Sequence, residues 1–175
     1  MSQRLVLFID SVHPILEEKL SHAGFLCQRH FKTTFEDLQN ILPQAYGLVI
    51  RSRFTIDETF LAFCPNLQFI ARSGSGLENI DVKLCEALNI RLYNSPEGNR
   101  NAVAEHALGM LLGLMNKLNK AHQEVRNGVW DREGNRGEEL DGKTIGIIGY
   151  GNNGAAFAKK LRGFDVRVLA YDKYK

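Results

Sequence analysis

The sequence predicts an α/β protein in which a parallel, doubly wound sheet is followed by the start of a Rossmann-type nucleotide-binding unit. Between residues 5 and 94, short apolar runs alternate with segments of helical periodicity. From residue 143, a β-branched apolar run leads directly into Gly-x-Gly-x-x-Gly and a helix-forming segment. A second apolar run then ends in an acid, Asp172, 18 positions after the last of these glycines.

The first part of the chain contains five expected strands, at residues 5–9, 25–27, 47–50, 67–71 and 90–93. Helices are expected between them, and several have a recognisable start. One helix has Pro14 at its first position, and a second begins at a capping box formed by Thr33 and Glu36. A third begins at Asp57, and a fourth has Asp81 as its N-cap. Short strands that alternate with helices indicate a parallel sheet of the flavodoxin-like kind.

Polar residues and glycines follow three of the expected strands. In such sheets, ligands bind beyond the carboxyl ends of the strands. Three arginines and a glycine-rich loop at one edge predict a small anionic substrate that carries carboxylate or phosphate, with solvated loop charges as the alternative. The expected substrate-binding residues are Arg51, Ser52, Arg53, Arg72, Ser73, Gly74, Ser75, Gly76 and Asn94.

A long helix is expected from residue 101 to about residue 120. Apolar residues lie on nearly all of its sides, so we expect it to be buried on several of them, with His106 in a structural role. The polar segment 119–142 is either an exposed linker or a strap around a neighbouring subunit, and Trp130 favours the strap.

The glycine pattern predicts a dinucleotide site. Gly149 allows the turn out of the strand, Gly151 lets the backbone approach a pyrophosphate, and Gly154 lets the helix pack against the strand. The N–H groups of the first helical turn face the phosphates. Asp172 would accept hydrogen bonds from the ribose hydroxyls, which favours NAD over NADP. The expected cofactor-binding residues are Gly149, Tyr150, Gly151, Asn152, Asn153, Gly154 and Asp172.

Composition narrows the class of protein further. Hydrophobic residues make up 44% of the chain and charged residues 24%, as in globular proteins. A formal net charge of +2 gives no argument for nucleic acid or for a membrane surface. The three cysteines are scattered, so we expect reduced thiols in a cytoplasmic protein, and no metal site.

Four separated motifs, in order over nearly the whole chain, resemble the D-isomer-specific 2-hydroxyacid dehydrogenases. They span residues 49–53, 71–81, 94–105 and 140–149. The resemblance implies a two-domain enzyme that moves hydride between NAD and a 2-hydroxy or 2-oxo acid. It assigns residues 1–96 to the N-terminal part of the substrate domain. Residues 97–175 would hold the inter-domain helix and the first βαβ of the NAD domain, and a homodimer would form through residues 101–120 and the segment to Trp130.

Within the family, the Arg-Ser-Arg sequence is most similar to members that oxidise 3-phosphoglycerate to 3-phosphohydroxypyruvate in serine biosynthesis. Alternatives are a glyoxylate or hydroxypyruvate reductase, or a non-catalytic NAD-sensing binding protein on the same fold. Formate dehydrogenases share the glycine fingerprint, but formate has no phosphate for the arginines to hold.

The resemblance places the catalytic Arg, Glu and His beyond Lys175, and none of the five histidines stands at the family's catalytic position. Asn153 also departs from the family, which commonly has an apolar residue there. We therefore expect no catalytic residue in this chain, and an N-terminal part of a longer dehydrogenase without turnover of its own. Two strands at residues 145–148 and 166–169 would be left with unpaired edges and one uncovered face.

Overall fold

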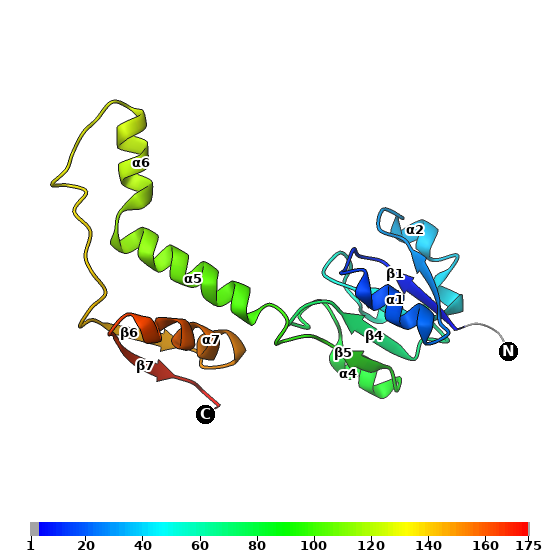
Figure 1. The fold of residues 1–175 in the computed structure, drawn as a ribbon. Helices are drawn as coiled ribbons and strands as arrows, with labels where there is room; N and C mark the ends of the chain where they lie inside the picture. Colours follow the sequence, from blue (N-terminus) through cyan, green and yellow to red (C-terminus); the bar gives the residue numbers. More distant parts are fainter. Residues whose placement is uncertain (1–3, 175) are drawn as a thin grey trace. The chain divides into compact units, whose positions relative to one another are not determined.

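The computed structural model describes residues 4–174, and the chain forms two compact units, Met1–Pro96 and Glu97–Lys175 (Figure 1). The first unit is a five-stranded parallel sheet with strand order β2-β1-β3-β4-β5. This is the flavodoxin-like order, so the predicted fold class is confirmed. Its strands are β1 (Leu5–Phe8), β2 (Leu26–Arg29), β3 (Ala45–Ile50), β4 (Phe69–Arg72) and β5 (Arg91–Tyr93). Its helices are α1 (Ile15–His22), α2 (Phe35–Leu38), the 3₁₀ turn η1 (Leu42–Gln44), α3 (Glu58–Leu61) and α4 (Val82–Ala87).

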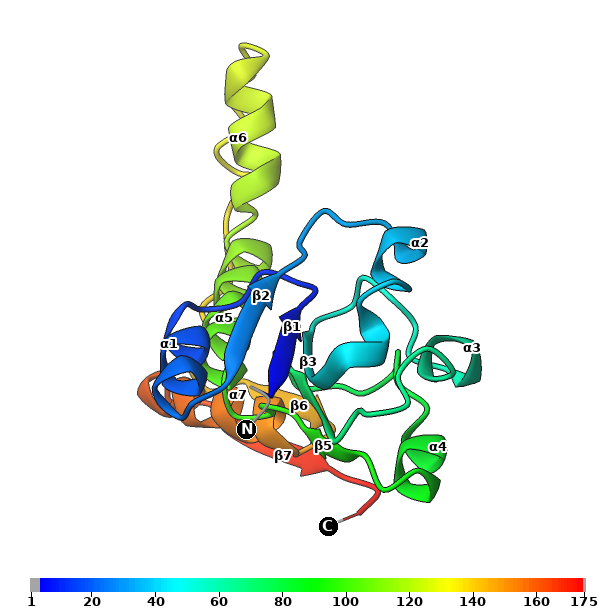
Figure 2. The same cartoon turned by 90° about the vertical axis from the view of Figure 1, so that its right-hand side faces the viewer.

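Helices cover both faces of this sheet, with α1 on one face and α2, α3 and α4 on the other (Figure 2). Successive residues of a strand point to opposite faces, so each apolar strand supplies both layers. Leu7 and Leu48 pack with Phe60 in the larger core, while Val6 packs with Leu16 in the smaller one. The continuous apolar runs in the sequence therefore mark strands that are buried on two sides.

Side-chain caps begin three of the short helices. The Asp57 and Asp81 carboxylates accept hydrogen bonds from the backbone N–H groups of Phe60 and Leu84, each at 3.0 Å. The predicted capping box on Thr33 is wrong by one residue. Thr34 is the N-cap and accepts from the N–H of Asp37 at 3.2 Å. The carbonyl of the preceding Thr33 accepts a hydrogen bond from Arg53 instead.

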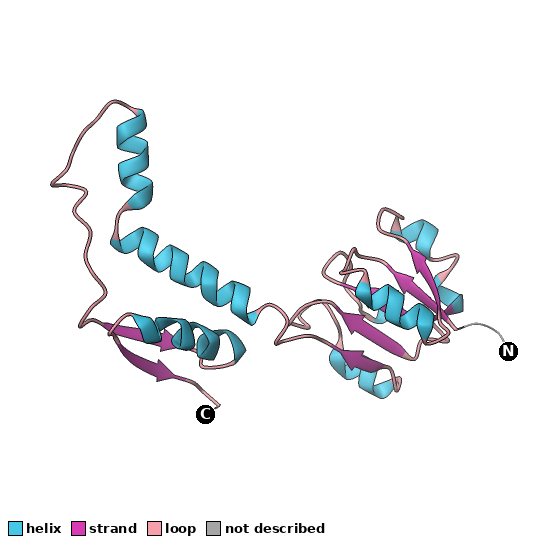
Figure 3. Cartoon of the chain, in the orientation of Figure 1, coloured by secondary structure: helices cyan, strands magenta, loops and turns pink. Residues whose placement is uncertain are grey.

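The second unit contains α5 (Arg100–Met115), α6 (Leu118–Arg126), β6 (Thr144–Ile148), α7 (Asn152–Lys160), the 3₁₀ turn η2 (Leu161–Gly163) and β7 (Arg167–Tyr171) (Figure 3). The strands β6 and β7 form a two-stranded parallel sheet. One face of it is covered, because Ile147, Ala158 and Leu161 are buried and the partly buried Leu108 and Leu111 of α5 pack against them. An ion pair of 2.7 Å between Lys160 Nζ and Glu105 Oε1 also joins α7 to α5.

The other face of the two-stranded sheet has no cover among the described residues. The side chain of Ile148 is 92% exposed and that of Tyr171 is 68% exposed. Apolar strand residues on an uncovered face are a surface that further packing would bury. This is the one-sided sheet that the sequence led us to expect.

The long helix expected from residue 101 is two helices, so that prediction is corrected. Lys117 adopts a left-handed conformation with φ 52° between α5 and α6. The Met115 carbonyl accepts a hydrogen bond from the N–H of Glu138 at 3.0 Å, and Lys117 Nζ donates to the Gly134 carbonyl at 3.0 Å. The segment after α6 thus folds back on the junction and replaces helical hydrogen bonds there.

The expected burial of this helix on several sides is also wrong within the chain. Of the described residues of α5, only Ala104 is fully buried, and Leu114 is 75% exposed. The cause is that α5 packs on α7 along one face only. Trp130 is 83% exposed in the segment that follows α6. Among residues 4–174, no helix is both long and apolar enough to cross a membrane.

Candidate functional site: an anion-binding rim and a dinucleotide loop

The register of the first unit brings the predicted substrate residues to one edge. Ile50 pairs with Arg72, and Ala71 pairs with Tyr93. The residues that follow β3, β4 and β5 therefore leave the sheet side by side at its carboxyl edge. We call this edge the rim; it consists of Arg51 to Arg53, Arg72 to Gly76, and Asn94.

The loop after β4 is held from both sides. The N–H of Ser73 donates to the Ile50 carbonyl at 2.8 Å, and Asn94 Nδ2 donates to the Ser75 carbonyl at 2.6 Å. The N–H of Ser95 adds a bond to the Gly74 carbonyl at 2.9 Å. Asn94 therefore fixes the loop through its amide, a contact that the sequence did not specify.

Arg72 folds back across this loop. The Arg72 guanidinium lies directly against Gly74, in the space that a Cβ at this position would occupy. The Arg72 Nε is buried and has no hydrogen-bond partner among the described residues. Within residues 4–174, the N–H groups of Ser75 and Gly76 donate to no backbone carbonyl, and the Glu78 carboxylate lies beside Gly76. An oxyanion at this point would satisfy donors that are otherwise left unpaired.

Arg51 presents its side chain to solvent while its backbone is fixed. Its N–H donates to Asp10 Oδ2 at 2.5 Å, and its carbonyl accepts from Asn79 Nδ2 at 3.2 Å. The same Asn79 amide reaches the Phe54 carbonyl at 2.8 Å. Ser52 is exposed beside Arg51. Sequence reasoning missed both Asp10 and Asn79, because each acts across at least 28 positions of chain.

Arg53 differs from the other two arginines. Its Nη1 donates to the carbonyls of Ile9, at 2.9 Å, and His30, at 2.8 Å, and its Nη2 donates to the Thr33 carbonyl. Its guanidinium also lies over the Phe54 ring, 4.6 Å from the ring centroid. Arg53 was expected to face the substrate, and in this structure its Nη donors face backbone carbonyls instead.

The glycine loop of the second unit has the geometry that the fingerprint requires. Gly149 adopts φ +92°, which favours glycine. A Cβ on Gly154 would overlap the Gly149 carbonyl oxygen, so the third glycine permits close packing of α7 on the turn. A Cβ on Gly151 would meet nothing within 4 Å, which leaves the space for an approaching phosphate. These three positions fit a bound dinucleotide.

The first turn of α7 carries no side-chain cap, and its N-cap residue is Gly151. Asn152 and Asn153 are both exposed, with N–H groups at the positive end of the helix dipole. Asp172 lies directly after β7, and its Oδ2 accepts from the N–H of Tyr150 at 2.6 Å. Its Oδ1 accepts from the N–H of Tyr174 at 2.8 Å. The acid thus lies beside the glycine loop.

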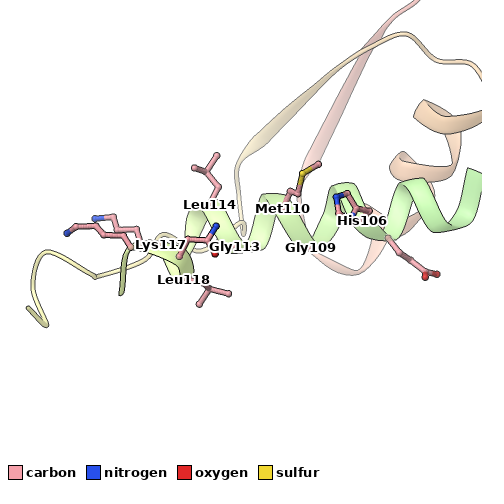
Figure 4. A pocket seen from close by; sticks show the side chains of 10 residues that line it. His106, Gly109, Met110, Gly113, Leu114, Lys117 and Leu118 are labelled. Atoms are coloured by element: carbon pink, nitrogen blue, oxygen red, sulfur yellow. The ribbon is translucent and has the colours of Figure 1, made fainter. Parts of the chain in front are cut away.

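A separate groove of about 940 Å³ runs along α5 and the start of α6 (Figure 4). Met110 and Leu114 project from the same side of α5, and Leu118 lines the groove from α6. These three apolar side chains are each more than half exposed. His106 also lines this groove and is exposed on the helix that was expected to be buried, and its structural role stays a prediction.

The chain matches known proteins over nearly all of its length. Residues 6–171 match the family model described as D-isomer specific 2-hydroxyacid dehydrogenase, catalytic domain. The chain is 38% identical over 133 residues to a D-3-phosphoglycerate dehydrogenase of Mycobacterium leprae, covering 76% of this chain and 25% of that protein. It is 36% identical over 140 residues to a hydroxypyruvate reductase of Thermotoga maritima, covering 80% of this chain and 46% of the relative.

Solved structures share the fold. The NAD-dependent formate dehydrogenase of Staphylococcus aureus, solved in complex with NAD, superposes with a TM-score of 0.80 at 25% identity. That match covers 98% of this chain and 56% of the other. The chain thus spans about a quarter to a half of the length of these relatives.

Proposed function

Because the chain belongs to the D-isomer-specific 2-hydroxyacid dehydrogenase family, we propose that it carries the substrate rim and the NAD loop of an NAD-dependent oxidoreductase for 2-hydroxy acids. The observation that carries this proposal is the register of β3, β4 and β5, which gathers unpaired anion-binding donors at one edge. Bound NAD would supply the nicotinamide that accepts or donates the hydride.

Each rim group has a chemical task in this proposal. The Arg72 Nε and the N–H groups of Ser75 and Gly76 bind the carboxylate of the acid, because among the described residues the Nε has no partner and the two N–H groups have no backbone acceptor. Arg51 offers a solvent-facing guanidinium to a second anionic group. Asn94 keeps the loop in place through its bond to the Ser75 carbonyl.

The second unit holds the cofactor. The N–H groups at the start of α7 bind the pyrophosphate, and Gly151 leaves room for it. Asp172 accepts from the adenosine ribose, and its charge disfavours a 2′-phosphate. The proton-transferring His–Glu pair and the carbonyl-polarising Arg are those that the family resemblance places outside these 175 residues. We therefore expect the chain to bind both reactants without turning them over.

We propose 3-phosphoglycerate as the substrate, in the cytoplasm and in serine biosynthesis. Arg51 and Arg72 provide two cationic groups on one rim, which suits an acid with a phosphate at its far end. The mycobacterial relative at 38% identity supports this choice. The hydroxypyruvate reductase of Thermotoga maritima supports the second candidate, reduction of an unphosphorylated 2-oxo acid.

Calorimetric titration of the 175-residue chain tests the proposal. We expect binding of NAD, and binding of 3-phosphoglycerate at least tenfold tighter than that of glycerate, glyoxylate or formate. Arg51→Gln should remove this preference. Arg91→Gln is the matched control, because Arg91 is exposed at the opposite end of β5. Equal affinity for glycerate and 3-phosphoglycerate would favour the hydroxypyruvate reductase. Binding of NAD with none of the acids would favour the NAD-sensing protein.

We also propose that the chain forms a homodimer through the groove along α5 and α6. Met110, Leu114 and Leu118 expose apolar surface there, and Trp130 exposes more in the following segment. Contiguous apolar surface of this kind marks protein–protein contact. A second copy of the chain would bury it, in agreement with the homodimer that the family resemblance implies.

A further inference from the structure

We propose that Arg53 is a positioning residue that fixes the Arg51–Ser52 loop, and that it does not bind the substrate. This inference rests on the proposed function for its ligands, and on geometry alone for the role of Arg53. It separates the two arginines of the Arg-Ser-Arg sequence, which look equivalent in the chain.

The donors of Arg53 are directed at three separate segments. Ile9 follows β1, His30 follows β2, and Thr33 precedes α2, and each gives its carbonyl oxygen to the guanidinium. A planar guanidinium presents several donors in a fixed fork, so one side chain can join three carbonyls. Arg53 therefore ties the loop after β3 to the carboxyl ends of β1 and β2 and to the segment before α2.

The face of the guanidinium is also occupied. It stacks over Phe54, which packs against Phe35 and Phe60 in the aromatic part of the core. A guanidinium with its edge on carbonyls and its face on a ring would have to break these contacts to reach an anion. His30 adds stiffness at the same point, since its Nδ1 lies 3.2 Å from Thr33 Oγ1.

Arg51 differs from Arg53 in that its backbone forms the hydrogen bonds and its side chain is left exposed. Its backbone is fixed by Asp10 and Asn79, while its side chain is exposed. Asp10 holds this loop at the backbone of Arg51 and the Arg53 side chain holds it two residues later, while the Arg51 side chain projects into solvent. Fixing the backbone of a loop before the ligand arrives reduces the ordering that binding requires.

Substitutions of Arg51 and Arg53 should therefore affect ligand binding and thermal stability differently. Loss of Arg51 removes one ion pair with the ligand, so it should affect phosphorylated acids selectively. Loss of Arg53 loosens the whole loop, so it should weaken every acid by a similar factor and should also lower the thermal stability of the first unit.

The test compares Arg51→Lys, Arg51→Ala, Arg53→Lys and Arg53→Ala in the 175-residue chain. A Lys ammonium keeps the charge but cannot reach three carbonyls as a planar fork does. We expect Arg53→Lys to behave like Arg53→Ala, with Tm lowered by about 5 °C or more. Backbone amide resonances near Ile9, His30 and Thr33 should shift in both variants. Arg51→Lys should retain binding of 3-phosphoglycerate, and neither Arg51 variant should change Tm.

Binding then separates the roles. For 3-phosphoglycerate and glycerate, Arg53→Lys should raise Kd by the same factor, on the order of tenfold, and leave the ratio of the two unchanged. The inference would be overturned if Arg53→Ala removed the difference in Kd between 3-phosphoglycerate and glycerate while Tm stayed constant. It would also be overturned if Arg53→Lys kept the Tm of the unsubstituted chain. If no acid binds to the unsubstituted chain, the proposed function fails. The stability and resonance measurements still decide whether Arg53 holds the loop.

Discussion

The backbone N–H of Tyr150 donates a hydrogen bond of 2.6 Å to the Asp172 carboxylate, across 22 positions of chain. This contact joins the glycine loop after β6 to the end of β7. The acid that the fingerprint assigns to the ribose therefore also holds the loop that faces the pyrophosphate. One carboxylate thus joins the two segments that we propose bind the dinucleotide.

Substitution of Asp172 by Asn should weaken the binding of NAD by about 10- to 100-fold, because a hydrogen bond to a charged group contributes ~1.5–3 kcal/mol. The preference for NAD over NADP should shrink as well, since the carboxylate no longer repels a 2′-phosphate. Titration calorimetry with both cofactors measures this. Asp141→Asn is the control, because Asp141 is exposed next to β6. Unchanged NAD affinity in Asp172→Asn would remove Asp172 from the site.

Gly154→Ala should destabilise the second unit by about 1–3 kcal/mol, the usual cost of overpacking. The added methyl group would overlap the Gly149 carbonyl oxygen, which is backbone and cannot rotate away. Gly146→Ala is the matched control, because a Cβ at Gly146 meets nothing within 4 Å. Urea denaturation followed by circular dichroism should separate the two variants. Equal stability of both would show that α7 does not pack this closely on the turn.

The pH dependence of stability should contain a contribution from Cys64. Burial raises the pKa of the Cys64 thiol from 9.0 to about 12. Between these two values the unfolded chain binds fewer protons than the folded chain, so stability falls as the pH rises. At pH 10 the loss is about 1 kcal/mol relative to pH 8.

Cys64→Ala should have a lower free energy of unfolding than the unsubstituted chain at pH 8, because it leaves a small cavity. Between pH 8 and pH 10 its stability should fall less, because the Cys64 thiol is absent. Cys27→Ala is the control, since the Cys27 side chain is only half-buried. Denaturation curves at the two pH values measure the difference. If stability falls by the same amount between pH 8 and pH 10 in Cys64→Ala and in the unsubstituted chain, Cys64 does not contribute to the pH dependence.

Leu114→Lys should shift the chain from dimer to monomer in sedimentation velocity, because a charge would be buried in the apolar contact. The side chain of Leu114 is 75% exposed in the single chain, so the substitution should not affect its folding. Leu88→Lys provides the control, as Leu88 is 52% exposed on the first unit. A monomer before substitution, or a dimer that survives it, would contradict the proposed interface.

The sequence by itself determined the local elements and the chemistry at their ends. Buried strands such as β3 appear as continuous apolar runs, and Asp57 and Asp81 mark helix starts through their own side chains. Gly149 and Gly154 could be assigned because their roles depend on backbone within a few residues. Features that depend on residues only a few positions apart can be predicted from the sequence.

The tertiary structure decided what depends on contacts between distant segments. The break at Lys117 arises because Glu138 bonds to the Met115 carbonyl, and no helix signal in residues 101–120 records that contact. Arg51 and Arg53 are chemically identical and two positions apart, yet one faces solvent and the other faces three carbonyls. The carbonyls that hold Arg53 come from segments 20 to 44 positions away, so only the packed fold could assign the two roles.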